Sequence, residues 1–430
     1  MALASYSQCA HSFVMIKSDN TLIEWRCHDC HDGPFWFIWE CRYCRHHTFA
    51  AGNSLEAARA LQGWYDVSSG LWSTTGWWNS ANCLTVLADW ALSAGVAAKT
   101  LDVPKIMANT FDNAQRVYVT AQKRVSATGW VTSTYRFDRR GKRGFAQFIN
   151  DYYDDEGWWA LALIRSWDVT GRQAYLDMAE RIFEDMQAGT DDRCGGGVWW
   201  SKEKQYKNAI ANELYLSVAA SLANRVPDKK QRYEQLAKDE WAWFKASGMI
   251  NGDGLINDGL AIDADGNCTN NGLATWSYNQ GVVLGGLVEL ANATGDPSYL
   301  GEATAIARAA VERLSDENGI IREADRCEPD CGADGSQFKG VFVRNLQYLH
   351  RAAPQDAFQK AIRKNADSIW AKNRNGENQF GIQWTGPADA GSGPNAATHS
   401  SAMDVIVAAL AIDRKGGLAR SSSSNSRSSS

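Results

Sequence analysis

Twelve helical segments that alternate between two kinds of surface constrain the fold of this 430-residue chain most strongly. The even-numbered segments are apolar on nearly every side, whereas the odd-numbered ones carry a charged face. A helix that is apolar all round lies buried, and an amphipathic helix covers it. Six pairs of inner and outer helices therefore predict an all-α chain folded as an (α/α)6 barrel. Hydrophobic periodicity, caps and breakers place the helices at 54–67, 78–95, 102–124, 154–169, 172–187, 207–226, 230–247, 276–294, 297–314, 338–352, 355–373 and 398–412.

Two loops repeat one pattern, in which Thr-Gly is followed by Tyr-Leu at the same spacing, at residues 170–176 and 294–300. Each loop joins an inner helix to an outer one, which indicates a repeated helical hairpin. Strand signals are few, and short hairpins are expected only near 130–137 and 197–200.

Four carboxylates and four aromatic residues crowd into residues 151–159, where an inner helix begins. Crowding raises the pKa of some of these carboxyl groups, because like charges resist joint ionisation. Aromatic faces stack on sugar rings, and a carboxylic acid beside a carboxylate is the chemistry of glycosidic bond cleavage. The alternative interpretation is an acidic first turn that complements the helix dipole. The other inner helices also begin with polar and aromatic residues, so the site is expected at the N-terminal ends of the inner helices.

Seven ordered blocks resemble glycoside hydrolase family 76, and within it the fungal α-1,6-mannanases; they lie at 76–82, 151–159, 194–200, 207–213, 276–281, 338–340 and 399–404. The resemblance covers about residues 53–413. It implies an (α/α)6 barrel that hydrolyses α-1,6-linked mannan with retention of configuration. It also implies that Asp154 is the nucleophile and Asp155 the general acid/base, because the adjacent aspartates of the family match these two positions.

Further candidates for sugar contacts stand in the same blocks, at Trp78, Asn79, Trp199, Trp200, Lys207, Asn208, Asn212, Tyr278, Asn279, Gln280 and Lys339. The tryptophans 199 and 200 follow three glycines, which allow the backbone to approach a ligand closely. Core packing remains an equal alternative for both tryptophans. Glu213, Asp404 and His399 are interpreted as structural groups.

The resemblance leaves competing functions open. A cell-wall transglycosylase of the same family would pass the glycosyl group to a sugar instead of water and would share every motif. A non-catalytic mannan-binding protein is a second alternative, against which the intact aspartate pair argues. An isomerase or lyase on the same barrel would rely on histidines or on Tyr and Arg, whereas this chain has only seven histidines.

The expected partner is α-1,6-mannan or a mannoprotein glycan, bound by a monomer. A net charge of -5 makes nucleic acid an unlikely ligand class. No stretch is expected to span a membrane. The resemblance implies a secreted or cell-wall protein, although residues 1–10 lack the basic and apolar regions of a signal peptide.

The N-terminal extension, residues 1–50, is rich in Cys and His, and residues 414–430 are expected to form a disordered Ser-rich tail. Two C-x2-C pairs in the extension have the spacing of a structural zinc site, with a metal-free fragment as the alternative; they are Cys27, Cys30, Cys41 and Cys44. Catalysis is expected to need no cofactor. Among the later cysteines, Cys83 is expected as a buried thiol, whereas the loop cysteines 268, 327 and 331 suit disulfides.

Overall fold

The computed structural model describes residues 11–16, 22–27, 42–125, 131–138 and 145–424, with side chains described at 52–117, 123 and 145–413. The chain divides into two compact units, Met1–Gly52 and Asn53–Ser430. The first unit contains an antiparallel hairpin of β1 (His11–Ile16) and β2 (Leu22–Cys27). Two cysteines of the predicted zinc site, at 30 and 41, lie outside the described residues, and the side chains of the other two are not described. The zinc site therefore stays a prediction.

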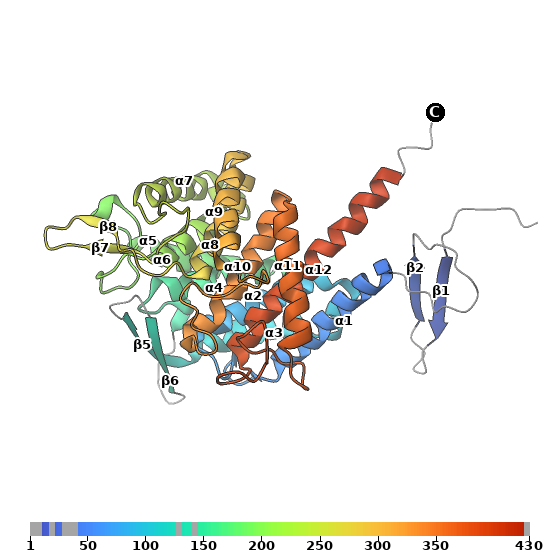
Figure 1. The fold of residues 1–430 in the computed structure, drawn as a ribbon. Helices are drawn as coiled ribbons and strands as arrows, with labels where there is room; N and C mark the ends of the chain where they lie inside the picture. Colours follow the sequence, from blue (N-terminus) through green and yellow to red (C-terminus); the bar gives the residue numbers. More distant parts are fainter. Residues whose placement is uncertain (1–10, 17–21, 28–41, 126–130, 139–144, 425–430) are drawn as a thin grey trace, which may run out of the picture. The chain divides into compact units, whose positions relative to one another are not determined.

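The second unit is a barrel of two concentric layers of helices (Figure 1). Within the described residues, six inner helices each contact the next, and the sixth contacts the first: α2 (Trp77–Ala94), α4 (Tyr153–Thr170), α6 (Ala209–Ala223), α8 (Ser277–Thr294), α10 (Gly332–Ala352) and α12 (Ala396–Ser424). The outer layer consists of the part of α1 (Arg42–Gln62) that belongs to the second unit, from Asn53 on, together with α3 (Val103–Asn113), α5 (Gln173–Ala188), α7 (Lys230–Ala246), α9 (Ser298–Leu314) and α11 (Asp356–Lys372). The predicted (α/α)6 barrel is thus confirmed.

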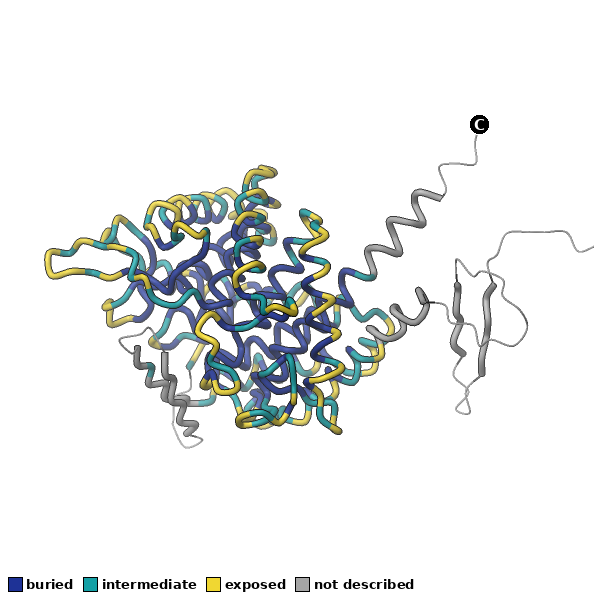
Figure 2. The backbone as a smooth tube through the Cα atoms, viewed as in Figure 1, coloured by how far each residue is buried: buried dark blue, intermediate teal, exposed yellow. Residues whose placement is uncertain are grey.

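The surface pattern of each helix explains its layer, as Figure 2 shows. All 15 residues of α6 are buried. In α5 the buried residues recur at helical spacing along one face only: Tyr175, Leu176, Ala179, Ile182, Phe183 and Met186. Each large apolar side chain that is fully buried contributes about 1.5–3 kcal/mol. Folding is therefore most favourable when helices like α6 lie inside the barrel and helices like α5 lie outside.

The predicted helix 102–124 is wrong in its second half. Helix α3 ends at Asn113, and β5 (Tyr118–Val125) then pairs antiparallel with β6 (Val131–Asp138). The sequence of β5 begins Tyr-Val-Thr, and aromatic and β-branched residues favour strands over helices. The strand expected near 130–137 is confirmed, but its partner was predicted as helix.

The other differences lie in loops and at helix ends, and the largest are that the helix predicted at 54–67 spans Arg42–Gln62 and that the last helix is longer than predicted. At 197–200 the structure has one isolated bridge, between Thr190 and Val198, instead of a hairpin. Helix α10 begins six residues before the predicted start at 338, and α12 continues to Ser424. The backbone is therefore helical up to Ser424 within the tail that was expected to be disordered. Two further short hairpins pair β3 (Tyr65–Asp66) with β4 (Leu71–Trp72) and β7 (Leu260–Ile262) with β8 (Cys268–Asn270).

One segment corrects the expectation about membrane spans. Residues Trp77–Thr100 are long and apolar enough, by length and composition, to be a candidate span. This segment contains α2, whose residues from Trp77 to Trp90 are all buried and which contacts α4 and α12 in the inner layer. Its place in the barrel accounts for its apolar character.

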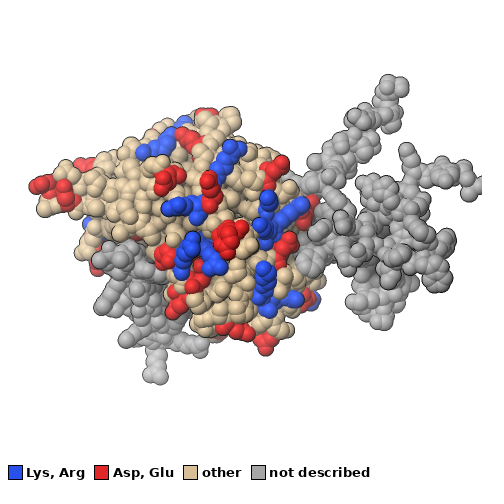
Figure 3. Space-filling view, viewed as in Figure 1, with Lys and Arg blue, Asp and Glu red and all other residues tan. Residues whose placement is uncertain are grey.

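On the face that Figure 3 shows, basic and acidic side chains are interspersed.

The cysteines of the second unit divide, as predicted, into one buried free thiol and cysteines in disulfides. Cys83 is a buried free thiol, as predicted. Disulfides join Cys194 to Cys268 and Cys327 to Cys331. The first bridge ties the loop after α5 to β8, and the second closes a short loop just before α10.

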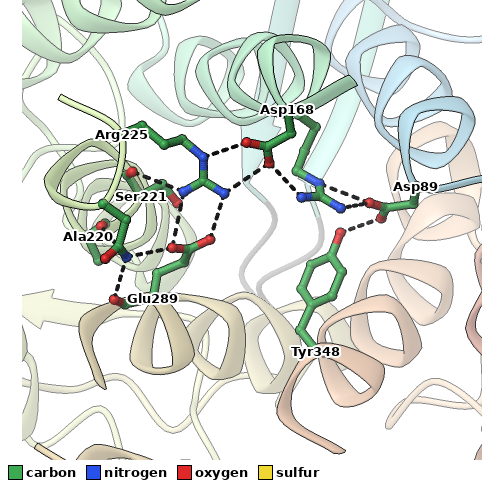
Figure 4. A network of polar contacts seen from close by, with 9 residues as sticks. Asp89, Asp168, Ala220, Ser221, Arg225, Glu289 and Tyr348 are labelled. Carbon is green, nitrogen blue, oxygen red and sulfur yellow. Dashed lines mark hydrogen bonds and ion pairs between the residues drawn. The ribbon is translucent and has the colours of Figure 1, made fainter. Parts of the chain in front are cut away.

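A chain of ion pairs links the C-terminal halves of the inner helices, around a cavity of about 320 Å³ (Figure 4). Arg225 donates from Nε to Asp168 Oδ1 at 2.8 Å and from Nη2 to Glu289 Oε1 at 3.1 Å. Arg165 in turn pairs with both Asp168 and Asp89. Alternating charges therefore connect α2 with α4 through Arg165, and α4 with α8 through Arg225, which follows the end of α6.

Replacing Arg225 with methionine should destabilise the barrel by about 2–3 kcal/mol, because it removes charged hydrogen bonds to Asp168 and Glu289 and leaves Glu289 without its cation. Arg225 and its partner Asp168 are only 13% and 15% exposed. The measurement is the change in free energy of unfolding in urea. The matched control is Lys229→Met, which breaks an ion pair with Glu180. The Lys229 side chain is 43% exposed, so this substitution should lower the free energy of unfolding by less than about 1 kcal/mol. Equal losses in the two variants would contradict a structural role for the network.

Candidate active site

The two predicted catalytic aspartates stand in the first turn of α4. The backbone N–H of Tyr153 donates to the carbonyl of Trp200 at 3.0 Å, which fixes how the chain enters the helix. Asp154 is 8% exposed and Asp155 is fully buried. At this position the helix dipole favours the ionised form of a carboxylate.

A buried lysine on β5 bridges the pair. Lys123 Nζ lies 3.1 Å from Asp154 Oδ2 and 2.6 Å from Asp155 Oδ1, and its side chain is 3% exposed. The ammonium group also lies 4.6 Å from the centre of the Tyr152 ring. Lys123 is not among the residues predicted from the sequence, because its strand has the pattern of a helix and nothing in the local sequence links a lysine at 123 to aspartates 31 and 32 residues later.

Each aspartate has a further partner of its own. Trp200 donates from Nε1 to Asp154 Oδ2 at 3.0 Å, and Asn150 donates from Nδ2 to Asp155 Oδ2 at 2.8 Å. Burial raises the pKa of Asp155 to about 7. The charge of Lys123 opposes this rise and that of Asp154 adds to it. Asp155 is therefore poised to hold or release a proton near neutral pH, as a general acid/base must.

A row of aromatic rings from four inner helices lies beside the pair. Trp78 stacks on Trp158 at 5.4 Å between ring centres, Trp158 on Tyr278 at 6.5 Å, and Tyr278 on Phe338 at 3.8 Å. These residues come from α2, α4, α8 and α10. Trp78 also donates from Nε1 to Asp334 Oδ1 at 2.8 Å. The row confirms that the N-terminal ends of the inner helices gather in one place.

Further acids surround Tyr278. Burial raises the pKa of its phenol, and the negative charges of Asp258, Asp154 and Asp334 add to the rise. Asp258 accepts a hydrogen bond from Tyr206 Oη at 2.5 Å, and burial raises its pKa to about 6. Asp258 and Asp334 are not predicted from the sequence, since each stands in a loop or at a helix start without a distinctive neighbour.

Lys207 and the nearby polar candidates are engaged within the protein. Lys207 Nζ is buried and donates to Asp191 Oδ1 at 3.0 Å and to the carbonyls of Arg193 and Gly196 at 2.6 and 2.7 Å. It therefore holds the glycine-rich loop in place. The carboxamide of Asn212 bonds both backbone groups of Val198.

The remaining polar candidates form similar contacts. Asn208 is the N-cap of α6 and accepts from the N–H of Ala211. Gln280 bonds both backbone groups of Ile256. Lys339 pairs with Glu328. In this conformation their polar atoms are turned to the protein, so a sugar contact from any of them stays a prediction.

The two tryptophans after the glycines have different places. Trp200 contacts Asp154, whereas Trp199 donates from Nε1 to Asp191 at 2.6 Å. A Cβ at Gly197 would come within 2.2 Å of Trp243, so this glycine serves a close approach between protein groups. Of the two predictions, ligand approach and core packing, the structure favours packing for the loop.

Several buried polar side chains have no hydrogen-bond partner among the described residues, and Asn79, Asn279 and Glu213 are three of them. Asn79 and Asn279 stand in the first turns of α2 and α8, and both amide atoms of each are unpartnered. Glu213 is also fully buried with neither oxygen bonded, and burial raises its pKa well above the ordinary value. Both asparagines lie at the site end of the barrel, and a sugar contact from either stays a prediction.

The profile of glycosyl hydrolase family 76 matches residues 66–421. The chain belongs to this family. Mannan endo-1,6-alpha-mannosidase DFG5 of Candida albicans is 29% identical over 290 residues, which cover 61% of this chain and 62% of that relative. A putative mannan endo-1,6-alpha-mannosidase of Schizosaccharomyces pombe is 31% identical and covers 47% of this chain and 48% of its own length. The chain thus matches less than two thirds of these relatives.

Solved structures show the same fold. An inactive variant of the alpha-1,6-mannanase GH76A of Salegentibacter sp. HEL1_6, with two aspartates replaced by asparagine and alpha-1,6-mannotriose bound, has a TM-score of 0.68. It is 20% identical, and the match covers 84% of this chain and 99% of that one. Dfg5 from Chaetomium thermophilum, in complex with glucosamine, has a TM-score of 0.67 at 17% identity, covering 84% and 90% of the two chains.

Proposed function

We propose that this family 76 protein is a glycosidase that cleaves α-1,6-mannosidic linkages in mannan with retention of configuration. The observation that carries the proposal is the spacing of the aspartates: one oxygen of each lies within 3.1 Å of the same nitrogen atom. Two oxygens that both contact one nitrogen at these distances lie closer together than the carboxyl groups of inverting enzymes, which are roughly 6.5–9.5 Å apart. Their spacing suits the about 5–5.5 Å of retaining enzymes.

The environments of the two aspartates suit different roles. Asp154 accepts a hydrogen bond from Trp200 in the first turn of α4, which orients its carboxylate as the nucleophile. Asp155 is fully buried with its pKa raised to about 7. In the proposed reaction Asp154 attacks the anomeric carbon while Asp155 protonates the leaving oxygen. Asp155 then takes a proton from the water that hydrolyses the glycosyl-enzyme.

The choice of mannan is supported by the relatives. Those at 29% and 31% identity are named as mannan endo-1,6-alpha-mannosidases, and the solved mannanase variant binds alpha-1,6-mannotriose. In this chain the row from Trp78 to Phe338 is buried and its rings stack on one another, but its Tyr278 lies close enough to Asp154 for the charge of Asp154 to act on its phenol. Aromatic faces of this kind bind sugar rings through their apolar sides.

The deciding experiment is incubation of the purified protein with unbranched α-1,6-mannan. Oligosaccharides of several sizes should appear early, which indicates endo action, and the first product formed should have the α configuration by NMR. Absence of cleavage would refute the proposed function, and a β product would refute the retaining mechanism.

Transfer to a sugar acceptor is the second candidate function. The complete burial of Asp155 favours it, because a site with little access for water leaves the glycosyl-enzyme to an incoming sugar. Adding acceptor oligosaccharides distinguishes the two functions. A transglycosylase would form products longer than its donor at the expense of hydrolysis.

We expect kcat/KM on mannan to fall as the pH rises above about 7. Asp155 must be protonated to act as the acid, and burial raises its pKa to about 7. The protonated, active form is complete below that value and is lost above it. A pH profile of kcat/KM reports the groups of the free enzyme. A basic limb that is also present in the residual activity of Asp155→Asn would assign the titration to another group.

We propose that catalysis needs no metal, because two carboxylates supply both nucleophile and acid. Turnover should be unchanged in EDTA, and a loss of turnover that zinc or calcium restores would contradict this.

We also propose a zinc site in the N-terminal extension. Elemental analysis of the full chain should find one zinc per molecule, bound by Cys27, Cys30, Cys41 and Cys44. The two disulfides support a place of action in an oxidising compartment, and the monomeric state stays a prediction.

A further inference from the structure

Lys123 occupies the space between the two aspartates. Its Nζ lies 3.1 and 3.3 Å from the oxygens of Asp154 and 2.6 Å from Asp155 Oδ1. The negative charge of Asp334 also acts on it, and the rings of Tyr152 and Trp200 lie 4.6 and 5.6 Å away. The ammonium group thus contacts two carboxylates and two aromatic faces, and the charge of a third carboxylate acts on it.

A substrate needs the same space. In a retaining reaction the anomeric carbon must come to about 3–3.5 Å from the nucleophile, while the leaving oxygen comes within hydrogen-bonding distance of the acid. The nitrogen of Lys123 already stands at such distances from both carboxylates. A bound ammonium group and a reacting sugar therefore exclude each other.

The attachment of Lys123 allows it to leave. It belongs to a two-stranded hairpin in which it pairs with Ser133 and whose strand β6 contacts α10. Its backbone N–H reaches Tyr152 Oη at 3.4 Å, a long hydrogen bond. A two-stranded hairpin is only marginally stable by itself, so its position depends on contacts such as these ion pairs.

We propose that Lys123 is a positioning residue that neutralises and holds the catalytic pair in the free enzyme and is displaced by the incoming sugar. This inference rests on the proposed glycosidase function. Displacement would also change the acid: Lys123 lowers the pKa of Asp155, so its departure favours the protonated form that the first step requires. The hairpin thereby couples substrate binding to protonation of Asp155.

The first test replaces Lys123 with methionine, which keeps the length of the side chain without its charge. Minor conformers are typically populated at about 0.1–10%, so abolishing the occluded state should tighten binding of α-1,6-mannotriose and lower KM by about tenfold or more. Below pH 7 kcat should be kept. Lys123→Arg should return KM toward the wild-type value. The control is Lys204→Met, a side chain that is 46% exposed and pairs with Asp191, and it should leave both constants unchanged.

A fall in kcat with an unchanged KM in Lys123→Met would overturn the proposal, since it would show that the ammonium group acts during the reaction. A loss of folding in Lys123→Met would appear as a lower thermal midpoint together with loss of binding. The arginine variant distinguishes such a loss of folding from a direct effect on binding. If that variant restores folding and kcat but binds mannotriose as the wild type does, displacement holds. If it restores folding with tighter binding, the charge does not occlude the site and displacement fails.

The second test needs no sugar and so separates this inference from the proposed function. Acetic anhydride should modify Lys123 far more slowly than Lys204 in the native protein, measured by peptide mass spectrometry. In the double variant Asp154→Asn, Asp155→Asn the protection of Lys123 should be lost, because its ion pairs are gone. In the wild type, saturation with mannotriose should likewise make Lys123 reactive. Persistent protection in the double variant would overturn the proposal whether or not mannan is the substrate, whereas failure of mannotriose to bind at all would count against the proposed function.

Discussion

Replacing Asp154 with asparagine is expected to reduce hydrolysis of α-1,6-mannan to background while the barrel stays folded. An amide cannot attack the anomeric carbon to form a glycosyl-enzyme. Asparagine has nearly the same shape and retains an oxygen that can accept from Trp200, as Asp154 does at 3.0 Å. Lys123 keeps its partner Asp155 at 2.6 Å. The measurement is turnover over long incubations, with the thermal midpoint as the check on folding.

Asp151→Asn is the matched control. Asp151 lies three residues earlier in the same acidic segment, but it is exposed and outside α4. Its substitution should leave turnover unchanged. If the two variants lost equal activity, the segment as a whole and not one nucleophile would be responsible. Wild-type turnover in Asp154→Asn would rule out the assignment directly.

The layers of the barrel could be predicted because they depend on local pattern alone. A helix such as α6, apolar along its whole length, can only be an inner helix, and the bounds of α4 through α9 agree with the prediction to within a few residues. The aspartate pair could also be located, since adjacent acids at the start of an inner helix must lie at the site end of the barrel. Both inferences need no knowledge of contacts distant in sequence.

The hairpin and Lys123 could not be predicted in the same way. Strand pairing between β5 and β6 is a contact between two segments, and β5 alone continues the helical periodicity of α3 well enough to be mistaken for it. Only the fold brings Lys123 to the aspartates. A single sequence contains no signal for such a contact.

The polar candidates show a second limit. Lys207 and Gln280 lie at the start of α6 and α8, but a helix start is surrounded by returning loops as well as by the site. Lys207 bonds the glycine-rich loop, and Gln280 bonds Ile256. Whether a side chain at a helix start faces substrate or loop depends on the path of the loop, which residue type and spacing do not determine.

Asp155→Ala should lose about 10²- to 10⁴-fold in activity on mannan, the usual contribution of general acid–base catalysis. The same variant should still form a glycosyl-enzyme from a mannoside with a good leaving group, such as dinitrophenyl, because that group departs without a proton. Asp154→Ala should be inactive on both substrates. The comparison of the two leaving groups therefore separates the acid from the nucleophile, which the loss of mannan hydrolysis alone does not.

Azide makes the assignment stereochemical. In Asp155→Ala, azide should attack the glycosyl-enzyme on Asp154 and give an α-mannosyl azide, since two displacements retain configuration. In Asp154→Ala, azide should enter the place of the missing carboxylate and give a β-mannosyl azide by one displacement, with the buried Asp155 still able to assist. The configuration of each product is read by NMR. The reverse pairing of variants and products would exchange the two roles while keeping the pair, and formation of no azide product in either variant would exclude a covalent intermediate on these residues.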